Sequence, residues 1–315
     1  KPLYKMSPKV GIIILHYESL TTTVESLQSV FALVYPLFET IVVNNSLLPT
    51  DGKTLREYFP KITLLSTPEN LGYAEGNNQG VAYAIKHDCA YVLLLNNDTV
   101  IAKDLLNHFV QTAQTHPKAG CLGAKIFYYD EPITLWHAGG FLHSKTLCLY
   151  HKGYKEVDLA NEYNNIEEIE YACGCSIFVT KEAIEKAGTL SKEFFLIWEE
   201  VDWCWRIRKA GYSCLFVPQA KVWHKISSGF QEGRGTLWHY FYFRNRLVFL
   251  KYHLPRKQRF AFYYFQFPKE LLSLFFYAFY PQATKATRLL YRAALTGIFD
   301  YYRGVLGPCS HKHFR

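Results

Sequence analysis

The segment of residues 91–99, Tyr-Val-Leu-Leu-Leu-Asn-Asn-Asp-Thr, constrains the fold of this chain more than any other part of it. An aliphatic run without alternation predicts a strand that is buried on both faces of a sheet. Polar side chains follow at its C-terminal end, which is where open α/β sheets bind their ligands. Asp98, with the carboxamide of Asn96 two residues earlier, suits a hard divalent cation that also holds a diphosphate. The alternative is a buried strand that ends in an ordinary Asn/Asp turn.

The rest of the N-terminal half predicts strands that alternate with helices. The further strands are expected at residues 10–16, 39–44 and 61–65, and the helices at about 19–33 and 72–86. This alternation predicts an α/β protein with a doubly wound, mostly parallel sheet. Right-handed crossovers place the C-terminal ends of parallel strands at one edge of the sheet. We therefore expect the polar residues at the strand ends to lie together there, namely His16, Tyr17, Asn44, Asn45 and residues 96–98.

The second half of the chain is less regular. Strand-like pieces are expected at residues 121–129, 175–180 and 212–217, and helices at 181–187 and 199–210. The eight cysteines contain no C-x-x-C pair, which argues against a zinc site and favours buried thiols in a reducing compartment. Nothing at residues 1–9 resembles a secretory signal peptide.

The net charge of +8 is concentrated at the C-terminus. Residues 234–315 carry 14 Lys and Arg against Glu270 and Asp300, a net charge of +12, whereas residues 1–233 carry a net charge of −4. No recognition motif accompanies the basic residues, so nucleic acid is not the expected partner.

The same region is rich in aromatic residues. Its two strongly apolar stretches, residues 260–267 and 271–280, are separated by polar residues, so neither reaches the roughly 20 residues of a spanning helix. Basic, aromatic segments of this kind suit a helix that lies at an anionic membrane surface. The alternatives are packing onto the rest of the chain or a dimer contact.

Several segments carry motifs in a characteristic order. They are Ile12-Ile-Ile-Leu-His16-Tyr17-Glu18, Ile41-Val-Val-Asn44-Asn45-Ser46, Glu69-Asn70-Leu-Gly72-Tyr73-Ala-Glu-Gly76-Asn77-Asn78-Gln-Gly80, Asn96-Asn97-Asp98, Phe194-Phe-Leu-Ile-Trp198-Glu199-Glu200-Val-Asp202 and Val222-Trp-His224-Lys-Ile-Ser-Ser-Gly229. Together they resemble the family-2 glycosyltransferases of the GT-A fold over residues 9–255. The resemblance is closest to the bacterial rhamnosyltransferase-like branch, which builds surface polysaccharides.

The resemblance implies a binding site for a nucleoside diphosphate sugar. The residues that it assigns to the donor are His16, Tyr17, Glu18, Asn44, Asn45, Asn70, Gly72, Tyr73, Gly76, Asn77, Asn96, Asn97 and Asp98. Asn44 stands where the family has an Asp that contacts the base, and its carbonyl can still accept that hydrogen bond. Gly72 and Gly76 are expected to let the backbone approach a phosphate or ribose, and the helix that follows to favour an anion at its N-terminus.

The resemblance also implies a divalent cation, Mg²⁺ or Mn²⁺. Asp98 and His224 are its expected ligands, and the ion would neutralise charge on the departing nucleoside diphosphate. His224 is expected to follow a strand and a turn that contains Pro218.

The acidic segment Glu199-Glu200-Val-Asp202 supplies the expected general base. The resemblance assigns this role to Glu200, which would take the proton of the acceptor hydroxyl. Asp202 is the alternative base, or else the N-cap of the helix. The expected acceptor-binding residues are Gly139, Gly174, Trp198 and Glu199.

These inferences predict an inverting, metal-dependent glycosyltransferase with a catalytic domain at residues 1–233, followed by a helical extension at 234–315. The donor half is expected at about residues 9–100 and the acceptor half at 101–233. The donor would be a UDP- or dTDP-sugar, with dTDP-rhamnose one candidate, and the acceptor a glycan or a lipid-linked saccharide. We expect a cytoplasmic protein at the inner face of the cell membrane, with an oligomer not excluded.

Two rival hypotheses remain open. A catalytically inactive scaffold on the same fold would bind nucleotide or glycan without turnover. A nucleotidyltransferase would require a Gly-rich, basic loop after the first strand, and the residues that follow His16 form no such loop.

Overall fold

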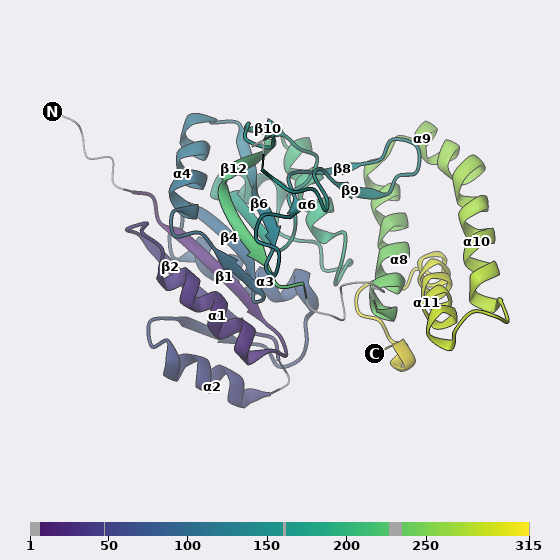
Figure 1. The fold of residues 1–315 in the computed structure, drawn as a ribbon, viewed down its shortest axis with the longest axis horizontal. Coiled ribbons are helices and arrows are strands. Elements are labelled where there is room, and N and C mark those ends of the chain that lie inside the picture. The colour runs from purple at the N-terminus through teal and green to yellow at the C-terminus, as the bar shows by residue number, and fades with distance from the viewer. Residues whose placement is uncertain (1–6, 47, 160–161, 227–234, 315) are drawn as a thin grey trace.

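The computed structural model describes residues 7–46, 48–159, 162–226 and 235–314 (Figure 1). The strands of the main sheet are β1 Val10–His16, β2 Phe38–Asn44, β3 Thr63–Ser66, β4 Tyr91–Asn96, β5 Thr99–Ile101, β6 Ala119–Tyr128, β7 Leu135–His137, β10 Glu167–Glu168, β11 Ser176–Thr180 and β12 Ser213–His224, and a separate hairpin is formed by β8 Gly140–Leu142 and β9 Leu149–His151. The helices of the body are α1 Leu20–Phe31, α2 Pro49–Tyr58, α3 Gly72–Lys86, α4 Leu105–Thr115, α5 Lys181–Ala187 and α6 Glu199–Lys209.

The main sheet is mixed but mostly parallel. Its order is β10-β12-β6-β11-β4-β1-β2-β3, with β5 paired to β12 and β7 paired to β6. Strand β1 runs parallel to both of its neighbours, β2 and β4, whereas β11 runs antiparallel to β4 and β6. The prediction of a doubly wound, mostly parallel sheet is confirmed.

Helices cover both faces of the sheet. Alternate residues of β1 point to opposite faces, because side chains alternate along a strand. Ile13 belongs to the core that α3, α5 and α6 cover, and Ile12 to the core that α1, α2 and α4 cover. Because helices cover both faces of the central strands, β1 and β4 are apolar along their buried length and polar at their C-terminal ends.

The last strand of the sheet differs from the sequence-based expectation. Strand β12 does not end at Val217 but continues through Pro218 to His224. Its register against β6 shifts between Val217 and Lys221, and this irregularity accommodates a proline that cannot donate to the ladder. His224 is therefore the last residue of a strand and pairs with Thr99 of β5, instead of following a turn.

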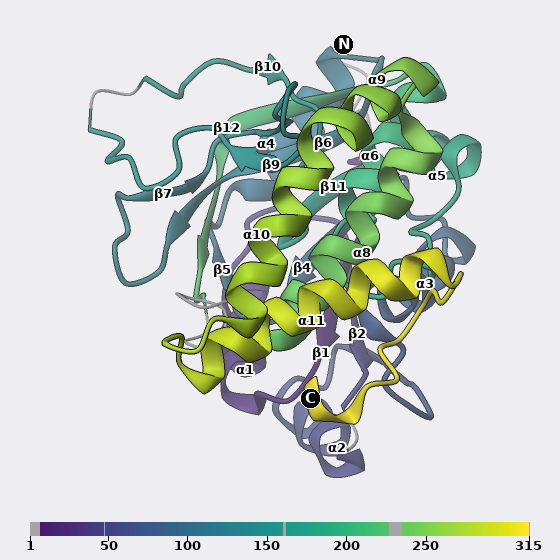
Figure 2. The ribbon, with the colours of Figure 1, turned by 90° about the vertical axis from the view of Figure 1, so that its right-hand side faces the viewer.

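A group of helices follows the sheet (Figure 2). They are α8 Thr236–His253, α9 Arg256–Ala261, the π-helical turn η1 Phe262–Gln266, α10 Phe267–Phe279, α11 Lys285–Tyr302 and the short 3-10 helix η2 Lys312–Phe314. Helix α8 packs against α11 and α6, and its Phe249 shares one core with Trp198 and Val201 of the body. No helix in the described ranges is long and apolar enough to cross a membrane.

The expected domain boundary at residue 233 falls outside the described residues, as do residues 227–229 of the His224 motif. The shared core means that α8 is packed as part of the body. The division of the chain at this point stays a prediction.

Candidate active site

The polar ends of the central strands lie side by side. In the parallel register, His16 is opposite Asn44 and Leu15 is opposite Asn96. The predicted convergence of these strand ends at one edge of the sheet is confirmed. Every polar residue that ends β1, β2 and β4 therefore belongs to one small region.

A cavity of about 550 Å³ opens at the end of β4. The sequence-predicted residues that line it are Tyr73, Asn96, Gly174, Glu199, Glu200 and His224. The others are Trp136, Leu149, Tyr150, His151, Tyr154, Cys173, Cys175, Leu196, Ile197, Trp238 and Tyr242. The cavity thus combines carboxylates and a histidine with a wall of aromatic rings.

Asp98 and His224 form a pair at this cavity. The Nε2 atom of His224 lies 3.1 Å from Oδ1 of Asp98, because the pairing of β5 with β12 brings the turn before β5 next to the end of β12. The backbone N–H of Lys225 donates to the carbonyl of Asp98 at 2.8 Å and holds the turn. Burial lowers the pKa of His224, but the charge of Asp98 and its hydrogen bond outweigh burial, so the pKa lies above its usual value.

This pair fits a divalent cation. One carboxylate oxygen and one imidazole nitrogen are adjacent, and oxygen with nitrogen is a donor set that Mn²⁺ accepts. The other ring nitrogen of His224, Nδ1, is buried and has no hydrogen-bond partner among the described residues. Two protein ligands would leave the remaining coordination positions of such an ion to a bound ligand and water.

Two adjacent carboxylates face the same cavity. Burial raises the pKa of Glu199 to about 8, and the charge of Asp202 adds to the effect. Burial and the charge of Glu199 hold the pKa of Glu200 well above its usual range. The Oε2 atom of Glu200 is buried without a hydrogen-bond partner in the described part of the chain. An orphaned carboxylate oxygen in a cavity is available to a ligand hydroxyl.

Gly174 leaves room beside Glu200. A Cβ atom at position 174 would lie 3.5 Å from the hydroxyl oxygen of Tyr73 and 3.7 Å from the carboxyl carbon of Glu200. The Tyr73 hydroxyl donates a hydrogen bond to the carbonyl of Gly174. Tyr73, assigned to the donor on sequence, therefore ties the start of α3 to Gly174, which the sequence assigned to the acceptor.

Asp202 is turned away from the cavity. Its two carboxylate oxygens lie 2.8 Å from Nε of Arg206 and 2.7 Å from Nε2 of His253, and the side chain is buried. The alternative of Asp202 as N-cap is wrong, because the helix begins at Glu199 after Trp198 and Asp202 lies within its first turn.

Two further expected acceptor residues do not line the cavity. Trp198 is fully buried against Tyr242 and Phe249, so it belongs to the core. Gly139 has a φ of 116°, and a Cβ atom there would meet Ile169 at 2.8 Å. Backbone conformation and packing explain the glycine.

The segment just before the two carboxylates is conformationally strained. Phe195, Ile197 and Trp198 have φ values of 63°, 67° and 80°, a region that costs residues other than glycine about 1–2 kcal/mol each. The Nδ2 atom of Asn245 in α8 lies 2.7–2.8 Å from the carbonyls of residues 194, 196 and 197. Arg244 donates to the carbonyl of residue 194 at 3.1 Å. Helix α8 thus holds the backbone that carries Glu199 and Glu200.

The loop before α3 is held by the protein itself. The Asn45 side chain donates to Asn70 Oδ1 at 3.0 Å and accepts from the N–H of Leu71 at 2.9 Å. The N–H of Gly72 donates to Asn70 Oδ1, and the N–H groups of Tyr73 and Ala74 donate to the carbonyl of Phe195, at 2.9, 2.8 and 3.3 Å. Because protein acceptors occupy these first N–H groups, the expected anion site at the start of the helix is not present in this structure.

The glycines of this loop are explained by packing. Gly72 has a φ of 74°, and a Cβ atom there would lie 2.6 Å from Phe195. A Cβ atom at Gly76 would lie 2.6 Å from Leu15 on β1. These glycines let α3 lie close to the sheet, and the expected approach to a phosphate is not their evident role. Asn77 is buried and donates to the carbonyl of Tyr73.

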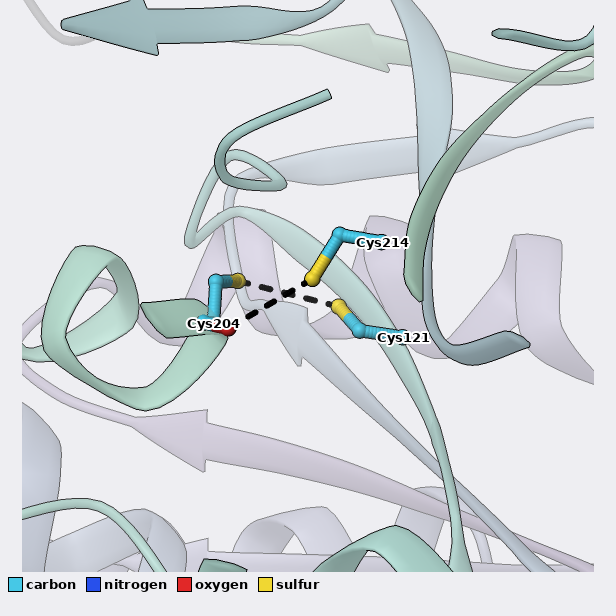
Figure 3. Close-up of side chains that lie close together, drawn as sticks. All are labelled: Cys121, Cys204 and Cys214. Carbon is cyan, nitrogen blue, oxygen red and sulfur yellow. Dashed lines mark hydrogen bonds between the residues drawn. The ribbon is translucent and has the colours of Figure 1, made fainter. Parts of the chain in front are cut away.

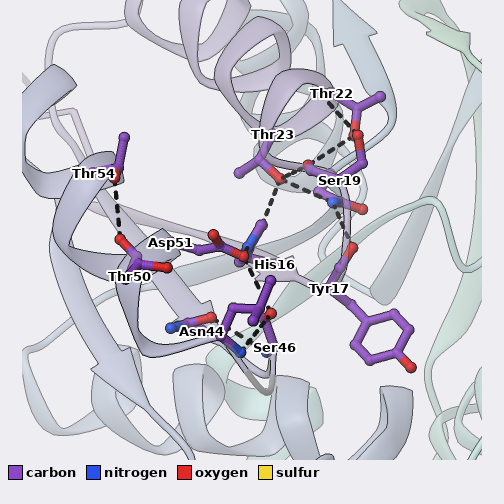
Figure 4. Close-up of polar contacts among 12 residues, drawn as sticks. His16, Tyr17, Ser19, Thr22, Thr23, Asn44, Ser46, Thr50, Asp51 and Thr54 are labelled. Atoms are coloured by element: carbon purple, nitrogen blue, oxygen red, sulfur yellow. Dashed lines mark hydrogen bonds and ion pairs between the residues drawn. The ribbon is translucent and has the colours of Figure 1, made fainter.

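His16 is buried at the end of β1, where both of its ring nitrogens have hydrogen-bond partners (Figure 4). Its Nδ1 lies 2.8 Å from Thr23 Oγ1 and its Nε2 lies 3.2 Å from Asp51 Oδ2. Asn97 donates to the same Thr23 hydroxyl at 2.9 Å. These contacts place His16 behind the strand ends, where it positions them without reaching the cavity.

The neighbouring residues that the sequence assigned to the donor differ in their exposure. Asn44 is buried, and its carbonyl accepts from the N–H of Ser46 at 3.2 Å. Tyr17 is exposed and its ring points away from this network (Figure 4), while Glu18 has a φ of 62° in the turn that leads to α1. Tyr17 and Glu18 are therefore at the surface, whereas Asn44 is not.

Sequence reasoning missed the aromatic wall of the cavity. Trp136 lies in β7 and Tyr154 follows β9, whereas Trp238 and Tyr242 come from α8, where their ring centroids are 4.5 Å apart. The spacing of Trp238 and Tyr242, four residues apart on one helix face, was a readable signal. Aromatic faces that line a polar cavity are suited to contact with sugar rings.

A cluster of three buried thiols lies apart from this cavity (Figure 3). The Sγ atoms of Cys121 and Cys204 are 3.7 Å apart, and Cys214 contacts the carbonyl of Cys204 at 3.6 Å. The three side chains come from β6, α6 and β12 and are fully buried. They pack in the core as free thiols.

Residues 11–186 match the model of the family described as Glycosyl transferase family 2. An uncharacterized protein of Sinorhizobium fredii is 32% identical over 243 residues, which cover 70% of this chain and 25% of that protein. The low-salt glycan biosynthesis hexosyltransferase Agl10 of Haloferax volcanii is 24% identical over 65% of this chain and 63% of its own. An N-acetylglucosaminyl-diphospho-decaprenol L-rhamnosyltransferase of Mycobacterium tuberculosis is 24% identical over 56% and 63%. The chain spans less than two thirds of the length of each.

Solved structures share the fold at low sequence identity. GalNAc-T7 with UDP, GalNAc and Mn²⁺ superposes with a TM-score of 0.63 at 13% identity, over 78% of this chain and 48% of that chain. The mannosyltransferase PcManGT of Pyrobaculum calidifontis, in complex with GDP-Man and Mn²⁺, superposes with a TM-score of 0.57 at 13% identity, over 95% and 88%. The predicted GT-A fold is confirmed by these likenesses.

Proposed function

Because the chain belongs to glycosyl transferase family 2, we propose that it transfers a sugar from a nucleoside diphosphate to a hydroxyl of a glycan or a lipid-linked acceptor. The observation that carries the proposal is the cavity at the end of β4. Its lining includes Glu200, whose Oε2 atom has no hydrogen-bond partner among the described residues, and His224, which lies next to Asp98. A base and a site for a cation are the two elements that such a transfer requires.

Glu200 is the proposed general base. The acceptor oxygen forms a bond to the anomeric carbon as its proton passes to the Glu200 carboxylate, and the bond from that carbon to the diphosphate oxygen breaks. Attack from the face opposite the leaving group inverts the configuration. A raised pKa strengthens Glu200 as a base once it is ionised. Asp202 is a weaker candidate, because Arg206 and His253 occupy both of its oxygens.

Asp98 and His224 are the proposed ligands of Mg²⁺ or Mn²⁺. When bound, the ion neutralises charge on the leaving nucleoside diphosphate. The contribution of the chain is to hold the two ligands in place, through the β5–β12 pairing and the hydrogen bond from Lys225 to Asp98. The likeness to structures that contain Mn²⁺ supports this proposal.

For the donor we propose a UDP- or dTDP-sugar, and dTDP-rhamnose is the first candidate to test. The relative from M. tuberculosis is named as a rhamnosyltransferase that acts on a diphospho-decaprenol acceptor, and GalNAc-T7 is described with UDP. For the acceptor we propose that sugar rings stack on the wall of Trp136, Trp238 and Tyr242. The role would then lie in the synthesis of a surface polysaccharide.

The experiment is a panel of UDP-, dTDP- and GDP-sugars with Mn²⁺, Mg²⁺ or EDTA, in which release of nucleoside diphosphate is measured. We expect release from one donor, its loss with EDTA and in Asp98→Ala, and a fall of at least about 100-fold in Glu200→Gln. Wild-type turnover in both variants would contradict the mechanism. Nucleotide binding by calorimetry without any release, with candidate acceptors present, would favour the inactive scaffold instead.

A further inference from the structure

Helix α10 presents an apolar face to the outside of the molecule. Leu272, Phe275, Phe276 and Phe279 are between 49% and 73% exposed. They follow the i, i+3, i+4, i+7 spacing of a single helix face. A helix at the surface of a water-soluble domain normally turns such a face inward. Here the apolar face is uncovered.

A groove extends this face toward α11. It has a volume of about 800 Å³, and its lining includes Phe275 and Phe279 of α10 together with Leu295, Phe299 and Tyr302 of α11. The stripe and the groove share two residues, so they form one continuous surface, which we call the α10–α11 face. Exposed apolar surfaces of this extent mark sites of interaction.

The helical group that carries this surface is basic. Residues 256–314 contain nine Lys and Arg, and their acidic residues are Glu270 and Asp300. Glu270 pairs with the buried Arg246, and Asp300 accepts from Tyr240 and lies 2.8 Å from His311. Both acids are therefore satisfied inside the helical group and do not offset the exposed cations.

Two of the basic groups lie directly on the aromatic rings of this surface. The guanidinium of Arg292 is 5.2 Å from the centre of the Phe279 ring, and that of Arg303 is 5.4 Å from the centre of the Phe299 ring. Aromatic rings beside basic groups are the composition of segments that lie at the interface of a membrane.

We propose that the α10–α11 face binds the surface of an anionic lipid bilayer, with the axis of α10 lying along it. A second copy of the chain fits poorly, because two such faces would bring like charges together with no exposed acid to pair them. Helix α10 has 13 residues, which suits an interfacial position. The inference stands on this surface alone, and it would bring the catalytic cavity to acceptors that are anchored in lipid.

The membrane-binding surface proposed here includes fewer residues than the basic C-terminal region that the sequence suggested. The net charge of the C-terminal region included Arg244 and Arg246, and both are buried and take part in internal contacts. The surface that contacts lipid is therefore α10 and α11 with their exposed basic residues, and α8 is not part of it.

The test is flotation of the full chain with lipid vesicles, without nucleotide or acceptor. Vesicles of phosphatidylcholine with about 30 mol% phosphatidylglycerol are compared with pure phosphatidylcholine. We expect binding at least about tenfold tighter to the anionic vesicles, weakened as the salt concentration rises from about 0.1 to 0.5 M.

The variants distinguish the contribution of the apolar face to vesicle binding from the effect of added negative charge. The pair Leu272→Asp with Phe276→Asp should weaken binding by at least about tenfold. The pair Leu272→Ser with Phe276→Ser tests the same positions without added charge and should also weaken it. The matched control is Tyr58→Asp with Leu159→Asp, at positions 63% and 75% exposed on the body, which adds the same charge and should leave binding within about twofold.

Three results would overturn the proposal. They are no flotation with anionic vesicles, equal loss in the control pair, and conversion of a dimer to a monomer by the α10 variants, which would assign the face to a second copy. Because the assay contains no donor, it can fail while sugar transfer succeeds, and the reverse also holds.

Discussion

Replacing Asn245 by Ala should unfold the strained segment that precedes Glu199 and Glu200. The two N–H groups of its side chain lie within hydrogen-bond distance of three carbonyls, those of Phe194, Leu196 and Ile197, and its Oδ1 accepts from Arg244 at 2.8 Å. Leaving buried polar groups unsatisfied costs about 1–3 kcal/mol for each group that water cannot reach. The left-handed residues store about 1–2 kcal/mol each, and relaxation of this strain when the hydrogen bonds of Asn245 are lost would offset part of that cost. We expect the free energy of unfolding to fall by about 2–4 kcal/mol.

Urea unfolding followed by tryptophan fluorescence measures this loss, since Trp198 lies within the segment. Asn245→Asp, which keeps the shape but cannot donate, should be at least as destabilising as Ala. Asn78→Ala is the matched control, because Asn78 makes two hydrogen bonds to the backbone of Leu190, a residue outside the left-handed region. Its loss should be smaller, about 1–2 kcal/mol. A change below about 0.5 kcal/mol in Asn245→Ala would refute the idea that this side chain holds the segment.

Three further outcomes follow from the site. The pKa of Glu199 is raised to about 8, so without metal the free energy of unfolding should fall as the pH rises from about 4.5 to 8, and Glu199→Gln should flatten this profile measured by urea unfolding; an unchanged profile would contradict the assignment. Gly76→Ala should lower the unfolding free energy by about 1–3 kcal/mol, because the new methyl group meets Leu15, and a neutral result would mean that α3 shifts freely. Tyr73→Phe removes the hydrogen bond to Gly174 and should cost about 1 kcal/mol in stability, while nucleotide binding by calorimetry stays within about threefold if the ring rather than the hydroxyl serves the donor.

The central sheet was predictable because its strands can be recognised in the sequence. Continuous aliphatic runs that end in His16, Asn44 and Asn96 fix both the strands and the edge at which they end, and the register agrees. Helix α4 also carried a readable signal, since its buried residues, which begin with Leu105 and Leu106, follow helical spacing. Helix α2 did not, because it contains Gly52 and its few apolar residues give no pattern.

Parts of the candidate site depended on contacts that no local pattern records. The roles of Asn245 and Arg244 arise from carbonyls about 50 residues away, and nothing in the spacing of α8 indicates them. Gly76 shows the opposite difficulty, because its motif suggests a ligand while packing against Leu15 explains it. Asp202 matched an acidic motif. Its pair with Arg206 has the i, i+4 spacing of a helix, whereas its contact with His253 becomes visible only in three dimensions.

The hydrogen bonds from Arg244 and Asn245 of α8 also limit which segments can be exchanged between related proteins. The carbonyl groups of Phe194 and Phe195 face two segments that are far apart along the chain, the first meeting Asn245 and the second the start of α3. A chimera whose C-terminal helices come from another protein therefore holds the backbone before Glu199 and Glu200 differently, unless it keeps Arg244 and Asn245. Helix α8 also packs against α11, and Arg244 donates to the carbonyl of Gly307, so an exchange that keeps the site should keep α8 and α11 from the same protein.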